Sequence, residues 1–69
     1  MNYKKLKLKI KEVFDTQESF AEAMGMSYTA LNLRLNGKTP WKTPEIVKAC
    51  TLLNIPLEEA YLYFFTLQV

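Results

Sequence analysis

The side chains that most often carry catalysis or bind metal ions are scarce in this sequence. The chain has one cysteine, Cys50, and no histidine among its 69 residues. A cysteine nucleophile needs a neighbouring base, which histidine usually supplies, and a structural zinc site needs several cysteine or histidine ligands. None of the seven aspartate and glutamate residues forms a pair flanked by apolar residues that would indicate acid–base catalysis. We therefore predict no enzyme activity, no small-molecule substrate, no metal and no cofactor.

Basic and hydrogen-bonding side chains remain as the source of function, and the basic ones are unevenly placed. Residues 1–42 hold eight basic and four acidic side chains, a net charge of +4. Residues 43–69 hold one lysine and three glutamates, a net charge of −2, and the whole chain has +2. A basic N-terminal part and an acidic C-terminal part are typical of a protein that binds a polyanion with one face. A lysine-rich helix face that meets only solvent explains the same charge equally well.

Length and composition limit the chain to one small domain, residues 1–69. Hydrophobic residues make up 49% and charged residues 23%, which is ordinary for a folded globular protein. The longest apolar run, residues 60–65, is far shorter than the roughly 20 residues that cross a bilayer. Residues 1–9 do not open into the apolar stretch of a signal peptide. We therefore expect a cytoplasmic protein. Because one cysteine permits no disulfide within the chain, helix packing or oligomerisation must stabilise the fold.

Two short helices with clear start and stop signals are expected in the first half of the chain. Thr16 and Ser27 are good N-caps, and each predicts a helix that begins one residue later. Gly25 and Gly37 stand where a left-handed residue ends a helix. Helices of about eight residues are unstable alone, so the two must pack across each other.

The segment before these helices fits two patterns. A helix over residues 3–14 would have an apolar stripe and would leave Leu8 outside it. The stripe consists of Leu6, Ile10, Val13 and Phe14. Residues 5–11 also alternate between lysine and apolar residues, which is the pattern of a strand. The length of the segment and the adjacent Val13 and Phe14 favour the helix.

Two further helices are expected after the loop at residues 38–42. Thr43 as N-cap and Pro44 at the first helical position predict a fourth helix that runs to about Leu53. Its buried residues would be Ile46, Ala49, Cys50 and Leu53. A fifth helix is expected from about Leu57, with Leu57, Ala60, Tyr61 and Phe64 as its apolar stripe. Residues 66–69 are compatible with a short strand or a frayed tail.

Residues 16–27, Thr-Gln-Glu-Ser-Phe-Ala-Glu-Ala-Met-Gly-Met-Ser, resemble the helix-turn-helix of the Cro and lambda-repressor-like family. The resemblance rests on Gln17 at the first helical position, Ala21 where the second helix crosses, and Gly25 at the turn. Residues 1–3, 20–22 and 33–38 also look like small regulators from phages and prophages of Gram-positive bacteria. The resemblance implies an all-α, compact five-helix lambda-repressor-like DNA-binding domain, with the helix-turn-helix at helices 2 and 3.

Helical geometry divides the third helix into two sides. At 100° per residue, one side carries Tyr28, Thr29, Asn32 and Leu33. The opposite side carries Ala30, Leu31 and Arg34, with Leu35 near the boundary. The resemblance implies that the first side enters the major groove of DNA.

The residue types on that first side can read base edges. Asn32 can pair bidentately with adenine, and Thr29 and Leu33 can contact a thymine methyl group. Tyr28 offers a hydroxyl and a ring edge, so a half-site that contains A·T pairs is expected. An alternative stays open for each of three residues. Tyr28 could only shield the start of the helix, Asn32 could only be solvated, and Leu33 could contact a protein partner.

Six residues around this helix are predicted to contact DNA phosphates: Gln17, Ser27, Asn36, Lys38, Thr39 and Lys42. Gln17 stands at a helix N-terminus, where backbone amides and the helix dipole attract a phosphate. Trp41 either packs in the core, which we favour, or donates its indole N–H to a phosphate. The resembled family usually has an apolar residue at the position of Arg34. We expect the stem of Arg34 to cover the core and its head to reach Glu18 or a phosphate.

The C-terminal end predicts self-association. The last nine residues include seven apolar ones: Tyr61, Leu62, Tyr63, Phe64, Phe65, Leu67 and Val69. One helix face buries about half of these, so we predict a dimer interface of Tyr61, Phe64, Phe65 and Leu67. The alternative is that the small core uses all of them. A two-fold dimer would set two recognition helices about 34 Å apart, which matches a palindromic operator.

Together these features predict a sequence-specific transcriptional regulator that binds double-stranded DNA. It would be a Cro-like repressor, from a phage or prophage, that occupies a palindromic operator as a homodimer. One alternative is an antirepressor or modulator that binds another phage regulator, which would fit Leu33, the modest net charge and the aromatic tail. The other is the antitoxin of a toxin–antitoxin pair.

Overall fold

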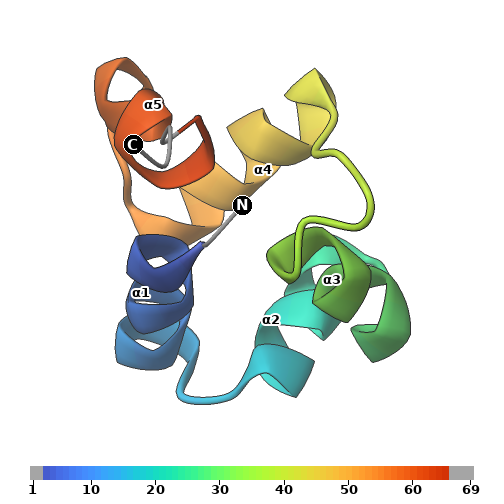
Figure 1. The fold of residues 1–69 in the computed structure, drawn as a ribbon. Coiled ribbons are helices and arrows are strands. Elements are labelled where there is room, and N and C mark those ends of the chain that lie inside the picture. Colours follow the sequence, from blue (N-terminus) through green and yellow to red (C-terminus); the bar gives the residue numbers. More distant parts are fainter. Residues whose placement is uncertain (1–2, 66–69) are drawn as a thin grey trace.

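Five α-helices and one 3₁₀ helix make up the fold of the computed structural model, which describes residues 3–65 (Figure 1). They are α1 (Lys4–Phe14), α2 (Gln17–Met24), α3 (Tyr28–Leu35), α4 (Thr43–Leu53), η1 (Leu57–Glu59) and α5 (Ala60–Phe64). No strand occurs within residues 3–65, so the all-α prediction is confirmed for that range. No helix there is long and apolar enough to span a membrane. The predicted strand or tail at residues 66–69 lies outside the described residues.

One hydrophobic core joins the helices. Helices α1, α2, α4 and α5 pack against one another, and α3 packs mainly on α2 at the edge of the molecule. In Figure 1, α3 and α5 lie on opposite sides of the fold. The fully buried large side chains are Leu6, Ile10, Phe20, Leu31, Leu35, Cys50 and Leu53. No polar or charged residue is buried within the described part of the chain. This packing leaves α3 as the helix with the most open surroundings.

Helix α1 removes the strand alternative for residues 5–11. Tyr3, Leu6 and Ile10 face the core at helical spacing, and the side chain of Leu8 is 62% exposed, as expected. Val13 was wrongly included in the apolar stripe, because it is 39% exposed. It lies at the edge of the stripe in the last turn, where the chain turns away toward α2.

The ends of α2 and α3 are built as the sequence predicts. The Thr16 hydroxyl accepts the backbone N–H of Ser19 at 3.1 Å, and the Ser27 hydroxyl accepts that of Ala30 at 3.0 Å. Gly25 has φ 77° and Gly37 has φ 73°, so both occupy the left-handed region that only glycine adopts at little cost. These bonds satisfy backbone groups that short helices would otherwise leave without partners.

Helix α4 begins one residue earlier than predicted. Lys42 is its N-cap and Thr43 its first residue, so Pro44 occupies the second helical position. The carboxylate of Glu45 accepts the backbone N–H of Lys42 at 3.0 Å, which is the bond that the third helical residue makes in a capping box. The predicted buried face of α4 is confirmed, because all four of its residues are buried.

The C-terminal segment differs from its predicted stripe. It begins as the 3₁₀ turn η1 and continues as α5, in which Ala60 and Phe64 face the core. Leu57 and Tyr61, which the stripe included, are each 60% exposed. A 3₁₀ turn has 3.0 residues per turn, so it rotates the side chains away from the positions that a continuous α-helix would give them.

Trp41 packs in the core, the alternative that we favoured. Its ring meets that of Phe64 edge-on, with centroids 5.0 Å apart, and that of Tyr3 with centroids 6.5 Å apart. The indole nitrogen is buried without a hydrogen-bond partner in the described part of the chain. The loop between α3 and α4 is therefore anchored to α1 and α5 through one aromatic side chain.

Candidate nucleic-acid interface

Helix α3 has one face that points away from the core and carries both polar and apolar residues. The helical spacing of its residues predicts this face. Leu31 and Leu35 are buried, with exposures of 0% and 1%. The other side carries the four predicted base-contact residues. These are Tyr28 and Leu33, which are 44% and 41% exposed, Thr29, which is exposed, and Asn32, which is half-buried. One outward face of one short helix therefore brings all four together.

Asn32 and Asn36 are joined by a hydrogen bond on this helix. The amide nitrogen of Asn36 donates to Oδ1 of Asn32 at 2.6 Å. An amide oxygen has two lone pairs, so Oδ1 can accept a second bond while the amide nitrogen of Asn32 still has two N–H donors. Asn32 thus keeps both groups that bidentate pairing with adenine requires. Asn36, predicted as a phosphate contact, is exposed and keeps a second amide N–H beyond the bond that orients Asn32.

The chain leaves α3 by folding back on its last turn. The backbone N–H groups of Lys38 and Thr39 both point to the carbonyl of Leu33, at 2.9 Å and 3.3 Å. Lys38 is exposed, and Thr39 is half-buried. These bonds place two predicted phosphate contacts directly beside the C-terminal end of the outward face of α3.

Two other predicted phosphate contacts stand at helix N-termini. Gln17 is the half-buried first residue of α2, and Ser27 is the exposed N-cap of α3. The Ser27 hydroxyl oxygen accepts from Ala30, which leaves its O–H free to donate to an anion. Backbone amides and the helix dipole favour negative charge at both places.

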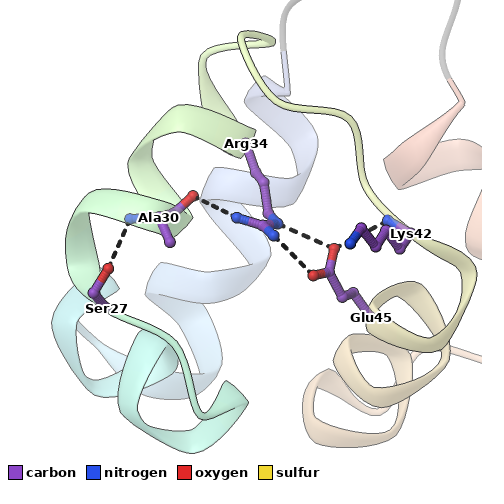
Figure 2. Close-up of polar contacts among 5 residues, drawn as sticks. All are labelled: Ser27, Ala30, Arg34, Lys42 and Glu45. Carbon is purple, nitrogen blue, oxygen red and sulfur yellow. Dashed lines mark hydrogen bonds and ion pairs between the residues drawn. The ribbon is translucent and has the colours of Figure 1, made fainter.

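The acidic partner of Arg34 is not Glu18, which the sequence had suggested as an alternative to a phosphate. Arg34 forms a two-pronged ion pair with Glu45 of α4 (Figure 2). Nε donates to Oε1 at 3.0 Å and Nη2 donates to Oε2 at 2.8 Å, while Nη1 donates to the Ala30 carbonyl at 3.0 Å. The Arg34 guanidinium holds the pKa of the Glu45 carboxyl below its usual value. The Lys42 backbone N–H acts in the same direction, against partial burial, which raises this pKa.

Glu45 is the functional-site residue that sequence reasoning missed. The sequence pattern assigned it no role in the site. Eleven residues separate it from Arg34, so no helical spacing connects the two. The departure of Arg34 from an apolar residue was the available signal, since a cation on the inner side of a helix requires an acidic partner.

The remaining charges separate into paired and free groups. On α1, Lys9 lies 3.9 Å from Glu12 and Lys11 lies 3.6 Å from Asp15. Within residues 3–65, neither Lys38 nor Lys42 has an acidic partner within ion-pair distance. Lys38 and the exposed Lys42 are thus available to an external anion.

The predicted dimer surface is only partly present on the outside. Tyr61 and Phe65 are 60% and 58% exposed, and Leu57, in the preceding 3₁₀ turn, is 60% exposed. Phe64 is only 3% exposed and packs on Trp41, so its assignment to the interface was wrong. Leu67 lies outside the described residues. We call Leu57, Tyr61 and Phe65 the C-terminal patch.

No group of three or more metal-ligating side chains comes together within residues 3–65. Cys50 is buried, and burial raises the pKa of its thiol, which keeps it protonated and unreactive at neutral pH.

Comparison with known families assigns the chain as a whole. The family described as "Protein of unknown function (DUF739)" matches residues 1–67. The chain therefore belongs to this family. No curated protein matches the chain.

Proposed function

We propose that this member of the DUF739 family is a sequence-specific regulator that binds double-stranded DNA, in the manner of a Cro-like repressor. In this proposal α2 and α3 act as a helix-turn-helix and α3 is the recognition helix. The observation that carries the proposal is the outward face of α3, whose four exposed or half-exposed residues are all able to contact base edges. Groups suited to phosphate contact flank both ends of that face.

The dimensions of α3 suit the major groove. An α-helix with its side chains is about 10–12 Å in diameter, and the major groove is about 12 Å wide, so α3 can lie within it. Asn32 would read adenine, while Thr29 and Leu33 would contact thymine methyl groups. Tyr28, at the first position of α3, would contact a base edge or the adjacent sugar.

The surrounding residues would hold the DNA backbone. Lys38, at the C-terminal end of α3, and Lys42, the N-cap of α4, have no acidic partner within ion-pair distance in residues 3–65. Ser27 and Gln17 present hydrogen-bonding groups at helix N-termini. Phosphate contacts position a protein on DNA without reading the sequence. Their contribution falls as salt rises, because binding releases counterions.

A second copy of the chain would complete the operator-binding unit. The C-terminal patch is apolar and exposed. A two-fold pair would present two recognition helices to the half-sites of a palindrome, as in phage and prophage repressors that this chain resembles. We test this arrangement with Phe65→Asp, which is expected to give monomers in sedimentation. Leu8→Asp, at an exposed leucine of α1, is the matched control and should leave the mass unchanged.

The C-terminal patch also supports a second candidate function. With Glu58 and Glu59 between its members, it is a surface that another regulator or a toxin could bind. The chain would then be an antirepressor, a modulator or an antitoxin. Loss of DNA binding together with a stable complex with such a protein would favour this function.

The decisive experiment is selection of random duplex DNA by the purified protein at about physiological salt, where specificity is meaningful. Enrichment of a palindrome with half-sites about 10 base pairs apart would support the proposal. No enrichment would contradict it and would favour the protein-binding candidate.

Two substitutions then separate base reading from phosphate contact. Asn32→Ala should cost about 1–3 kcal/mol on the selected site and relax one base position. Lys38→Ala should weaken binding to all sequences and reduce the salt slope by about one. Lys11→Ala removes the same charge from an exposed position on α1 and should change neither quantity. Unchanged affinity in both test variants would contradict the placement of α3 in the groove.

A further inference from the structure

The ion pair between α3 and α4 is the least exposed one within residues 3–65. The side chains of Arg34 and Glu45 are 13% and 21% exposed, whereas both pairs on α1 have a partner that is more than 70% exposed. Its two parallel N–H···O bonds, at 3.0 Å and 2.8 Å, use the planar fork of the guanidinium. The single ammonium of lysine cannot reproduce this geometry.

Each partner of the pair is also tied to its own helix. The third guanidinium bond runs to the Ala30 carbonyl at 3.0 Å, one turn back in α3. The Glu45 carboxylate accepts the backbone N–H of Lys42 at 3.0 Å, at the start of α4. Figure 2 shows this continuous series of bonds, which extends from the N-cap Ser27 through Ala30, Arg34 and Glu45 to Lys42. The guanidinium and the carboxylate are therefore each held in place by a second bond, to the backbone of their own helix.

The pair bridges the loop that carries the free lysines. The loop is tied at one end to the Leu33 carbonyl by Lys38 and Thr39, and at the other end to Glu45 by Lys42. Helix α3 buries only Leu31 and Leu35 and packs mainly on α2. The ion pair therefore adds a direct polar link between α3 and α4 to the hydrophobic packing of Leu31 and Leu35.

We infer that Arg34 and Glu45 are positioning residues for the DNA-binding surface, which hold α3 at a fixed angle to the loop of Lys38 and Lys42. The inference rests on the proposed function. Base contacts from Asn32 and Leu33 and phosphate contacts from the loop can form together only when that angle is correct. Specific affinity then depends on the pair. Affinity for unrelated DNA, which comes from lysine charge, does not.

Two variants test the pair. Arg34→Lys keeps the charge and removes the fork, and Glu45→Gln keeps an oxygen for the Lys42 N–H and removes the charge. Glu12→Gln is the matched control, because it makes the same change in net charge and removes the exposed contact with Lys9. The quantity measured is the affinity for the selected operator divided by that for a scrambled duplex. Binding is measured by fluorescence anisotropy at a temperature where circular dichroism shows each protein to be folded.

We expect this ratio to fall about tenfold in each test variant, and no further in the double variant, because the two residues act as one unit. Glu12→Gln should keep the ratio of the unmodified protein. In the DNA-free protein, amide hydrogen exchange should become faster in α3 than in α2 for both test variants. Arg34→Lys is the milder change and provides the result alone if Glu45→Gln does not fold.

The two ways of failing are distinct. If the unmodified protein is selective and the folded test variants keep its ratio, the pair only adds stability, and the inference is overturned while the proposed function stands. If the unmodified protein prefers no duplex, the proposed function fails and the inference is overturned with it.

Discussion

Residues 16–37 and residues 57–65 both form short helices, but different forces set their boundaries. In the first region each helix has a hydroxyl at its start, from Thr16 or Ser27, and a left-handed glycine at its end. In the second region no side chain caps η1 or α5, and the chain starts as a 3₁₀ turn after Pro56. The contacts of Ala60, Tyr63 and Phe64 with the core determine which way this segment faces.

This difference explains why one region could be predicted and the other could not. A cap or a glycine end is a bond between residues a few positions apart, so it is visible in the sequence. The face of a five-residue helix depends on which distant residues it meets. The outward face of α3 was predicted correctly, whereas the stripe of the fifth helix wrongly included Leu57 and Tyr61.

The largest expected effect distinguishes two adjacent phenylalanines in the second region. Phe64→Ala should lower the free energy of unfolding by about 3–5 kcal/mol, because it removes a buried ring that packs on Trp41. Phe65→Ala should change it by less than about 0.5 kcal/mol, because Phe65 is 58% exposed. Urea unfolding at a concentration where the protein is monomeric measures both. Equal losses would show that α5 packs with a different face.

The helix crossing in the first region is the next test. Ala21 is 2% exposed where α2 meets α3, so Ala21→Val should overpack the crossing and cost about 1–3 kcal/mol. Ala23→Val, at a half-buried position of the same helix, is the matched control and should cost less. Thermal unfolding compares the two. An unchanged melting temperature for Ala21→Val would mean that the helices do not approach closely at this point.

The Thr16 and Ser27 caps of the first region predict a smaller loss of stability. The second region has no side-chain caps to remove. Thr16→Ala and Ser27→Ala should each cost about 1 kcal/mol, because each leaves a backbone N–H without its acceptor. Thr51→Ala makes the same chemical change in the middle of α4, where the hydroxyl only bonds the carbonyl of the preceding turn, and should cost less than about 0.5 kcal/mol. Denaturant unfolding of all three gives the comparison. Equal costs would indicate that the caps add nothing beyond the helix itself.

The smallest expected effect depends on pH and involves the end of the first region. Because Arg34 lowers the pKa of Glu45 in the folded protein, ionised Glu45 stabilises the fold at neutral pH. This stabilisation is lost as pH falls below about 4.3, the usual glutamate value, through the lower folded pKa. The melting temperature of the unmodified protein should therefore exceed that of Glu45→Gln at pH 7, and the difference should shrink in this acid range. A constant difference would contradict the role of the ionised carboxylate.

Much of the candidate site could be predicted because it is local. The residues Tyr28, Thr29, Asn32 and Leu33 share one side of α3 by helical periodicity alone, and the end of that helix follows from Gly37. The bond from Asn36 to Asn32 joins residues four apart, but the sequence analysis had placed Asn36 on a phosphate. Side-chain amides can bond either way, and helical spacing does not choose between the two.

By itself the sequence determined α2 and α3, their N-caps, the two left-handed glycines and the outward face of α3. All of these follow from hydrogen bonds and periodicity within a few residues. The tertiary structure decided the partner of Arg34, the place of Trp41 between Tyr3 and Phe64, and the inward face of α5. These features join residues far apart in the chain. Their distances are set only when the whole core packs, because several partners of the right chemistry compete for each position until then.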